Sequence, residues 1–264
     1  WFTWLDRDLS VAGKVIFKDN SGKLTSKIIQ CEEPIFFIPN CPPHLKSGSE
    51  RESLTINKEN HLKPLIASLR VNSAFIDEEE KKPKDKKLGK TLRTLILREL
   101  NKGCESPVIN NGDQIVDYDL VLYDTQSPSL IGLNKEFLAS GRLDNLGSSI
   151  PALYSMINAS KEELLSEQTS INIIALFDNE EIGSLTYQGA DSNFFLMHLK
   201  RIFSQSLNIT KTPYSEDLFL RFMAKSYVIS ADLAHAFNPN YPEKFQAQHQ
   251  NKVQQGVVLK INES

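Results

Sequence analysis

The sequence predicts an α/β protein with a strand-rich first half and a second half in which strands and helices alternate. Near the N-terminus, two apolar runs enclose a turn that contains glycine, which is typical of a β-hairpin. From about residue 141, short continuous apolar runs alternate with segments of helical period. Such runs are typical of strands that are covered on both faces, so the second half is expected to contain a buried sheet.

The first half divides into a hairpin and an extended segment. Residues 14–17 and 24–29 form the two apolar runs, and residues 19–22 (DNSG) form the predicted turn. Prolines punctuate residues 34–45. Because proline has no N–H to donate to a neighbouring strand, this segment is expected to be a loop or an edge strand.

Three further segments complete the first half. Residues 91–102 carry leucines at helical spacing, and Gly103 is a plausible end for that helix. Residues 115–123 alternate apolar and polar residues like a half-buried strand. Residues 77–90 are a charged run around Pro83, which predicts a solvated loop, with a regulatory docking tail as the alternative.

The second half is expected to contain two helices and three strands. Residues 145–158 and 192–206 have the helical period. Continuous apolar runs predict strands at residues 171–177, 226–230 and 257–261.

Composition excludes several classes of partner. The 264 residues include 30 basic and 33 acidic side chains, for a net charge of −3. A nucleic-acid or anionic-membrane binder needs a concentrated basic face, which this balance does not support. No apolar stretch approaches the roughly 20 residues of a transmembrane helix. The three cysteines are few and odd in number, which favours free thiols in a reducing cytosol over a Cys31–Cys41 disulfide.

Acidic side chains follow a turn or an apolar run at three places. They are Asp144, the adjacent pair Glu180 and Glu181, and Asp232. In an open α/β sheet, ligands bind at the carboxyl ends of the strands, where such side chains would meet. Two divalent metals need several anionic ligands and a further base, so these four carboxylates suit a two-metal hydrolytic site. Solvated acidic loop ends are the alternative interpretation.

A set of ordered motifs spans nearly the whole chain. The motifs are WFTWLDRDLSVAGKV, CEEPIFFIPNCPPHL, ENHLKPLIA, SGRLDNLGSS, LFDNEEIGS with QGA, and SYVISADLAHAFNPNY. Together they resemble the aspartyl aminopeptidase family, whose relatives include the vacuolar aminopeptidase I proteins. The resemblance implies a zinc-peptidase α/β sandwich, incomplete in these residues, with an inserted β-rich dimerisation domain. Residues 1–133 would be the inserted domain, and residues 134–264 the middle of the catalytic domain.

The resemblance also implies roles for the four carboxylates. Asp144 would bridge two Zn²⁺ ions, while Glu181 and Asp232 would each bind metal. Glu180 would be the general base, taking a proton from a water that the metals activate and passing it to the leaving amine. One of the two metal positions is expected to exchange for Mn²⁺ or Co²⁺.

Three residues resemble family positions that contact substrate. His44 would reach the active site of a neighbouring subunit, His235 would line the pocket or orient a ligand, and Lys260 would pair with the acidic side chain of the substrate. A loop histidine and a surface lysine are the ordinary alternatives. His249 is expected to be structural, and His61 and His198 to be packing or surface residues.

The chain departs from the family pattern in its metal-binding histidines. The family uses one His from each end of its peptidase sequence, and residues 1–264 contain neither segment. Residue 1 is Trp and the first residues read as the middle of a strand, so we expect that the chain was cut. A polypeptide limited to these residues is expected to bind metal weakly and to be inactive. Asn238, Phe245 and Gln255 also replace usual family residues, which affects substrate preference and oligomer contacts.

The expected function is removal of N-terminal Asp or Glu from peptides by a cytoplasmic, homo-oligomeric enzyme, a dodecamer built from dimers. The vacuole is the alternative compartment. An aminopeptidase that prefers neutral residues such as Leu is one alternative function. A truncated scaffold that keeps the assembly surface without the chemistry is another.

Overall fold

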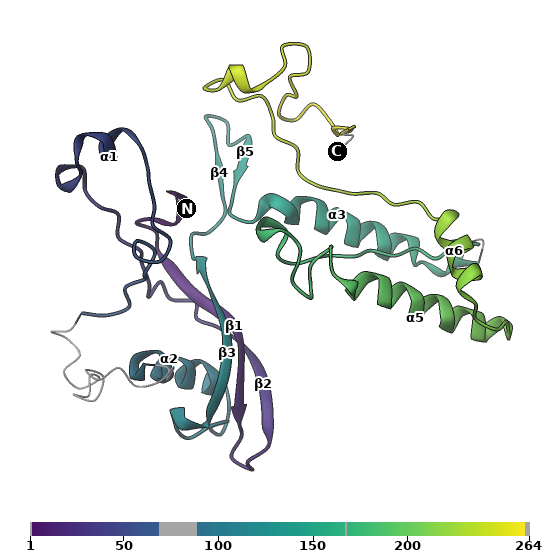
Figure 1. The fold of residues 1–264 in the computed structure, drawn as a ribbon, viewed down its shortest axis with the longest axis horizontal. Helices are drawn as coiled ribbons and strands as arrows, with labels where there is room; N and C mark the ends of the chain where they lie inside the picture. Colours follow the sequence, from purple (N-terminus) through teal and green to yellow (C-terminus); the bar gives the residue numbers. More distant parts are fainter. Residues whose placement is uncertain (1, 69–88, 167, 262–264) are drawn as a thin grey trace. The chain divides into compact units, whose positions relative to one another are not determined.

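The computed structural model describes residues 2–68, 89–166 and 168–261, and the chain divides into two compact units. The first unit is Trp1–Gly141 and the second is Arg142–Ser264. The first contains all the strands of the described residues, and the second contains the longer helices (Figure 1). The protein is therefore a mixed α/β chain with small sheets, and each unit is described by itself.

A three-stranded antiparallel sheet organises the first unit. Strands β1 (Leu9–Lys18), β2 (Leu24–Gln30) and β3 (Ile115–Asp124) lie in the order β2-β1-β3. The predicted hairpin and the predicted strand at residues 115–123 are thus confirmed. β1 and β3 approach closely at Gly13, where a Cβ atom would lie 2.1 Å from the carbonyl oxygen of Asp119. Only glycine fits there, so this position fixes the pairing of the two strands.

Helix α2 (Lys90–Asn101) covers one face of this sheet. Its Ile96 and Leu100 are fully buried against Val15 and Phe17 of β1, and against Ile29 of β2. The leucine spacing that predicted a helix is therefore the face that forms the core. The chain turns just after the helix at Gly103, whose φ is +74°.

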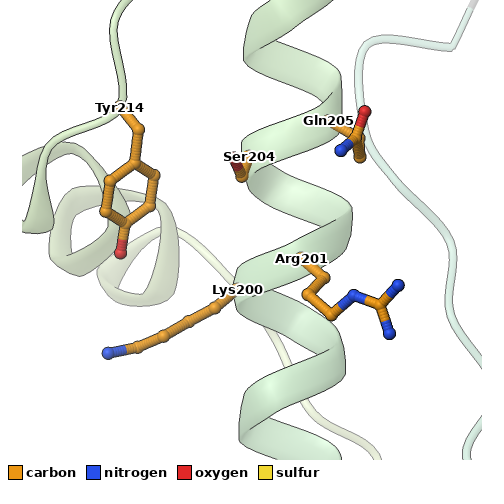
Figure 2. A pocket seen from close by; sticks show the side chains of 5 residues that line it. All are labelled: Lys200, Arg201, Ser204, Gln205 and Tyr214. Carbon is orange, nitrogen blue, oxygen red and sulfur yellow. The ribbon is translucent and has the colours of Figure 1, made fainter.

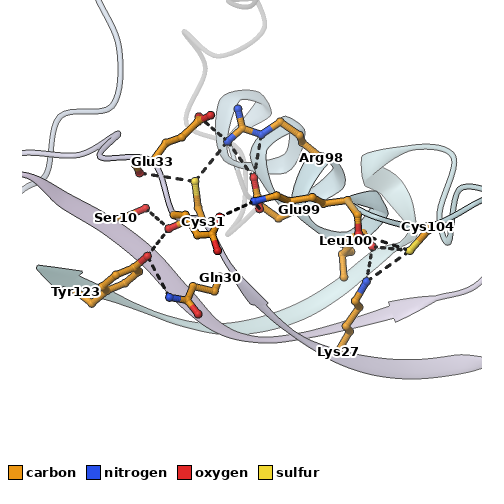
Figure 3. Close-up of polar contacts among 12 residues, drawn as sticks. Ser10, Lys27, Gln30, Cys31, Glu33, Arg98, Glu99, Leu100, Cys104 and Tyr123 are labelled. Atoms are coloured by element: carbon orange, nitrogen blue, oxygen red, sulfur yellow. Dashed lines mark hydrogen bonds and ion pairs between the residues drawn. The ribbon is translucent and has the colours of Figure 1, made fainter. Parts of the chain in front are cut away.

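Polar contacts tie the end of β2 to the helix and to β3 (Figure 3). The carbonyl oxygen of Cys31 accepts hydrogen bonds from Ser10 Oγ and from Tyr123 Oη. Arg98 of α2 lies 3.4 Å from the Cys31 sulfur and 3.0 Å from Glu99 Oε1. The Glu99 side chain is only 3% exposed, so the guanidinium compensates a carboxylate that water scarcely reaches. Cys31, Cys41 and Cys104 are all free, as predicted.

The rest of the first unit consists of short elements. Residues 34–45 are mostly extended, with isolated bridges at Phe36, Phe37 and Ile38, as their prolines predicted. The first residues begin as a 3₁₀ turn rather than a strand. The remaining short elements are η1 (Phe2–Trp4), η2 (Pro43–Leu45), α1 (Gly48–Glu52), η4 (Gly112–Gln114) and the hairpin of β4 (Ser129–Ile131) and β5 (Phe137–Ala139).

The second unit is built on three helices. They are α3 (Leu143–Ala159), α5 (Asn193–Thr210) and α6 (Glu216–Ala224), and the first two confirm the predicted helices. Leu199, Phe203 and Phe219 are the buried core between α5 and α6. The Ser192 and Ser215 side chains accept hydrogen bonds from the first turns of α5 and α6, which fixes where each helix begins. Short turns α4 (Glu162–Leu165), η5 (Glu180–Ile182) and η6 (Pro242–Lys244) complete the unit.

The three strands predicted for the second half are not formed. Residues 171–177, 226–230 and 257–261 are extended but unpaired, and side chains such as Val228 and Val257 are exposed. A strand exists only where a neighbour completes its hydrogen-bond ladder, and no described segment forms such a ladder with these three. The prediction of a buried sheet in this half is therefore wrong for the described residues.

Two predictions concern other parts of the chain. Most of the charged run at residues 77–90 lies outside the described residues. Among the residues that the structure does describe, no helix combines the length and the apolar character needed to cross a membrane.

Candidate metal centre

Asp144 lies at the N-terminal end of α3, where the backbone is not yet helical. Asp144 has φ −83° and ψ 110°, and Asn145 has φ −118° and ψ 31°. Arg142, just before the helix, adopts the left-handed conformation with φ 62°. These angles turn the chain sharply before the regular helix starts, and the carboxylate of Asp144 stands at the turn.

Asp232 lies in an extended segment and is held by a lysine from later in the chain. Lys260 Nζ donates a hydrogen bond to Asp232 Oδ2 at 2.9 Å. Both side chains are about half exposed, at 53% for Lys260 and 52% for Asp232. The pair therefore joins two segments, neither of which forms a helix or a strand.

The environment of Asp232 stabilises its charged form. The hydrogen bond from Lys260 is the main cause that lowers the pKa of Asp232 below its usual value, and the ammonium charge adds to it. The backbone N–H of Leu233 and the side chain of Asp144 also interact with this carboxylate and favour the lower pKa. Asp144 and Asp232, 88 positions apart in the numbering, are therefore neighbours in the fold.

Asn145 connects the same two segments, a role that no motif or periodic pattern in the sequence indicates. Its Nδ2 donates a hydrogen bond to the carbonyl oxygen of Ala231 at 2.8 Å. A Cβ atom on Gly147 would lie 3.2 Å from Leu233, so the helix and this residue are in close contact. The one feature of the sequence that could have indicated this contact is position, because Asn145 and Ala231 are each adjacent to a predicted metal ligand.

Glu180 and Glu181 begin the 3₁₀ turn η5 in a tightly folded loop. Asn179 before the turn and Gly183 after it both have positive φ, at 60° and 105°. The loop closes through Ser184, whose N–H bonds to the carbonyl of Asn179 at 3.0 Å. Both glutamates are exposed. The backbone therefore bends sharply on both sides of the two glutamates.

The predicted substrate residues lie in different environments. His235 is exposed in the extended segment after Asp232, and His44 is exposed on η2 of the first unit. His249 contacts Gln246 through Nδ1 at 2.9 Å. His61 accepts a hydrogen bond from its own loop, and His198 contacts the carbonyl of Phe194, one turn earlier on α5.

The structure brings two of the four predicted carboxylates together. Within the described ranges, no three His, Cys, Asp or Glu side chains are grouped closely enough to hold a metal, so neither glutamate joins Asp144 and Asp232. The pair nevertheless suits a divalent cation in its chemistry. Carboxylate oxygens are donors that zinc accepts, and one of the two, Asp232, already binds the Lys260 ammonium. Asp144 and Asp232 therefore fit part of a zinc site.

A shallow cavity elsewhere in the second unit holds none of these residues. It has a volume of about 250 Å³ and is lined by residues of α5 and the following loop: Lys200, Arg201, Ser204, Gln205 and Tyr214. Figure 2 shows that Lys200 and Arg201 extend in different directions from the helix. Because the two cationic groups do not converge, this cavity does not form an anion site.

Comparison with known protein families matches the whole chain. The sequence model described as aminopeptidase I zinc metalloprotease (M18) matches residues 1–264. An aspartyl aminopeptidase from Aspergillus oryzae is 36% identical over 277 aligned residues, which cover 99% of this chain and 54% of the relative. An aspartyl aminopeptidase from Caenorhabditis elegans is 35% identical, with 99% of this chain and 53% of the relative covered. The chain thus spans about half the length of the curated relatives it matches.

Solved structures agree with the sequence match. The crystal structure of yeast aminopeptidase 1 superposes with a TM-score of 0.71 at 27% identity, covering 96% of this chain and 50% of that one. A dodecamer structure from Saccharomyces cerevisiae superposes with a TM-score of 0.66 at 26% identity, covering 94% of this chain and 49% of that one. The chain therefore belongs to the aminopeptidase I zinc metalloprotease (M18) family.

Proposed function

We propose that this chain provides the carboxylates of a metallo-aminopeptidase that removes Asp and Glu from peptide N-termini. The observation that carries the proposal is the proximity of Asp144 and Asp232, which belong to separate segments and meet beside the Lys260 ammonium. Relatives that are named aspartyl aminopeptidases and match almost the whole chain support the reaction and the substrate class.

Three residues are proposed to hold the metal, and a fourth to move the proton. Asp144, Glu181 and Asp232 would supply oxygen ligands, with Asp144 shared between two ions. Zinc, when bound, supplies the positive charge that polarises the scissile carbonyl and acidifies water. Glu180 takes a proton from the attacking water and delivers it to the amine that leaves.

Lys260 is proposed to give the preference for acidic residues. A lysine that pairs with the Asp232 carboxylate has the reach and charge to pair with the carboxylate of a substrate side chain. His235, three positions after Asp232 on the same segment, is proposed to contact the substrate. His44 of the first unit is proposed to do so in a neighbouring subunit.

The assembly and setting are part of the same proposal. A dodecameric structural relative supports a homo-oligomer, which we propose is built from dimers through residues 1–133. The free cysteines support a reducing compartment such as the cytoplasm, with the vacuole as the alternative.

The test is metal content and peptide cleavage in the intact protein. After dialysis, elemental analysis is expected to find two zinc ions per chain, one of which exchanges for Mn²⁺ or Co²⁺. Removal of the metal by 1,10-phenanthroline is expected to abolish release of Asp from an aspartyl peptide, and added zinc to restore it. A protein that keeps full activity without bound metal would refute the proposal.

A further inference from the structure

The geometry points to Asn145 as a positioning residue that clamps the Asp232 segment onto the start of α3, so that Asp144 and Asp232 face the same cation. This inference rests on the proposed function, because it concerns the arrangement of two proposed metal ligands. The clamp consists of the bond from Asn145 Nδ2 to the Ala231 carbonyl and the contact of Leu233 with Gly147.

Within the part of the chain that the structure describes, the Asp232 segment has no support from regular secondary structure. Residues 226–236 form no helix or strand, and most of their side chains are exposed. Tyr227, Val228 and Ile229 are 88%, 76% and 78% exposed, so the other described residues bury little of their apolar surface. An extended segment without a ladder or a core depends on individual contacts for its position.

The contacts that hold this segment lie directly beside the two carboxylates. Asn145 immediately follows Asp144, and Ala231 immediately precedes Asp232, so one hydrogen bond joins the direct neighbours of both carboxylates. The contact of Gly147 with Leu233 lies on the other side of Asp232. The segment is thus held at the residues on both sides of Asp232.

The hydrogen bond between Asn145 and Ala231 does not depend on the charges at the site. The Lys260 ammonium also holds Asp232, but a divalent cation would compete with it for the same carboxylate oxygen. The amide of Asn145 bonds to a backbone carbonyl, which is neither a proposed ligand nor charged. The clamp can therefore keep the two carboxylates in place when Lys260 is displaced. Partners that orient metal ligands typically contribute about 10- to 100-fold to metal affinity.

The first measurement follows the segment without any metal. Nitroxide labels on Ile150→Cys and Val228→Cys, with the exposed cysteines replaced as Cys41→Ser and Cys104→Ser, report the distance between α3 and the segment by pulsed electron resonance. We expect a narrow distribution in the metal-free parent and a broader one after Asn145→Ala. Asn158→Ala, on the same helix, is the control, and its distance distribution is expected to stay as narrow as that of the parent. An unchanged distribution in Asn145→Ala would overturn the inference.

The second measurement is zinc affinity, by competition with a chromophoric chelator in the intact protein. Asn145→Ala is expected to weaken binding about 10- to 100-fold, and Asn145→Gln, which keeps an amide donor, to recover part of it. Equal affinity in the parent and Asn145→Ala would show that the clamp does not position the ligands.

Failure of the proposed function and failure of the clamp give different results. If the parent protein takes up no zinc, the proposed function fails, while the label distances still decide whether Asn145 clamps the segment. If Asn145→Ala does not fold, Gly147→Ala replaces it. Alanine suits a helix, but its Cβ would press on Leu233 at 3.2 Å, so the label distance is expected to shift. An unshifted distance in Gly147→Ala would count against the clamp.

Discussion

Lys260 Nζ lies 2.9 Å from Asp232 Oδ2 and joins the last described segment of the chain to a proposed metal ligand. The contact stabilises the carboxylate anion, so its pKa lies below the usual value. Because the folded-state pKa is the lower one, the stability from this pair is complete above the ordinary Asp value. It is lost as the pH falls through the lowered value.

Replacing the lysine is expected to release this carboxylate. In Lys260→Met, the pKa of Asp232 should rise toward its ordinary value of 3.8, because the main stabilising donor is gone. The titration of the Asp232 carboxyl carbon by NMR in the metal-free protein measures this directly. Lys252→Met, an exposed lysine earlier in the same stretch, is the control and should leave the curve unchanged. An unchanged curve in Lys260→Met would show that the ion pair does not form in solution.

Glu180→Gln is expected to separate proton transfer from metal binding. If Glu180 is the general base, its loss should lower kcat by about 100- to 10,000-fold, while the zinc content stays at the parent level. Steady-state cleavage of an aspartyl peptide together with elemental analysis measures both quantities. Glu243→Gln, an exposed glutamate in η6, should match the parent. A variant that lost its zinc instead would make Glu180 a ligand and not the base.

The stability of the packing between α5 and α6 should fall at both acid and alkaline pH. Glu216 accepts hydrogen bonds from Lys200 at 2.8 Å and from Tyr214 at 2.7 Å, so its pKa is lowered, mainly by Lys200. The same contacts with Glu216 raise the pKa values of Lys200 and Tyr214. The stability from Glu216 is therefore lost below its ordinary pKa of 4.5, and that from Tyr214 is lost as the pH rises above 10.

Thermal unfolding across this pH range tests the network. The parent should lose stability relative to Glu216→Gln as the pH falls below 4.5 and again as it rises above 10, with a constant difference between these limits. Glu162→Gln, outside these contacts, is the matched control. A difference between parent and Glu216→Gln that does not change with pH would contradict the network.

The core under α2 should determine the stability of the first unit. Leu100 is fully buried, and Leu100→Ala is expected to lower the free energy of unfolding by about 2–5 kcal/mol through lost burial and a residual cavity. Leu133 is 96% exposed, so Leu133→Ala should change the free energy of unfolding by less than about 0.5 kcal/mol. Urea unfolding followed by circular dichroism compares the two, and similar losses would contradict the assigned core.

The elements that sequence reasoning predicted correctly are those whose information is local. The leucine spacing of residues 91–102 is the buried face of α2, and the DNSG turn sets the register of β1 and β2. The strand predictions from apolar runs such as residues 171–177 were wrong because strand pairing depends on distant parts of the chain. A run of apolar residues indicates burial, but a strand also needs a hydrogen-bonded neighbour, and no described segment pairs with this run.

The same distinction applies to the candidate site. The sequence singled out Asp144 after a turn and Asp232 after an apolar run, and the fold brings these two carboxylates together; their role as metal ligands stays a prediction. The role of Asn145 was not predictable, because an amide that bonds to a carbonyl 86 residues away leaves no periodic signal. The positions of Glu180 and Glu181 depend on the left-handed residues around them, which local composition only suggests.

The most direct test of the proposed function is the ratio of kcat/KM for an aspartyl substrate to that for the matching leucyl substrate, measured on the intact zinc-loaded protein. A charge-assisted contact from Lys260 predicts a preference for the aspartyl substrate of about 10- to 100-fold. A preference for the leucyl substrate would contradict the acidic specificity. Failure to cleave either substrate with zinc bound would contradict the assignment of the site as a peptidase.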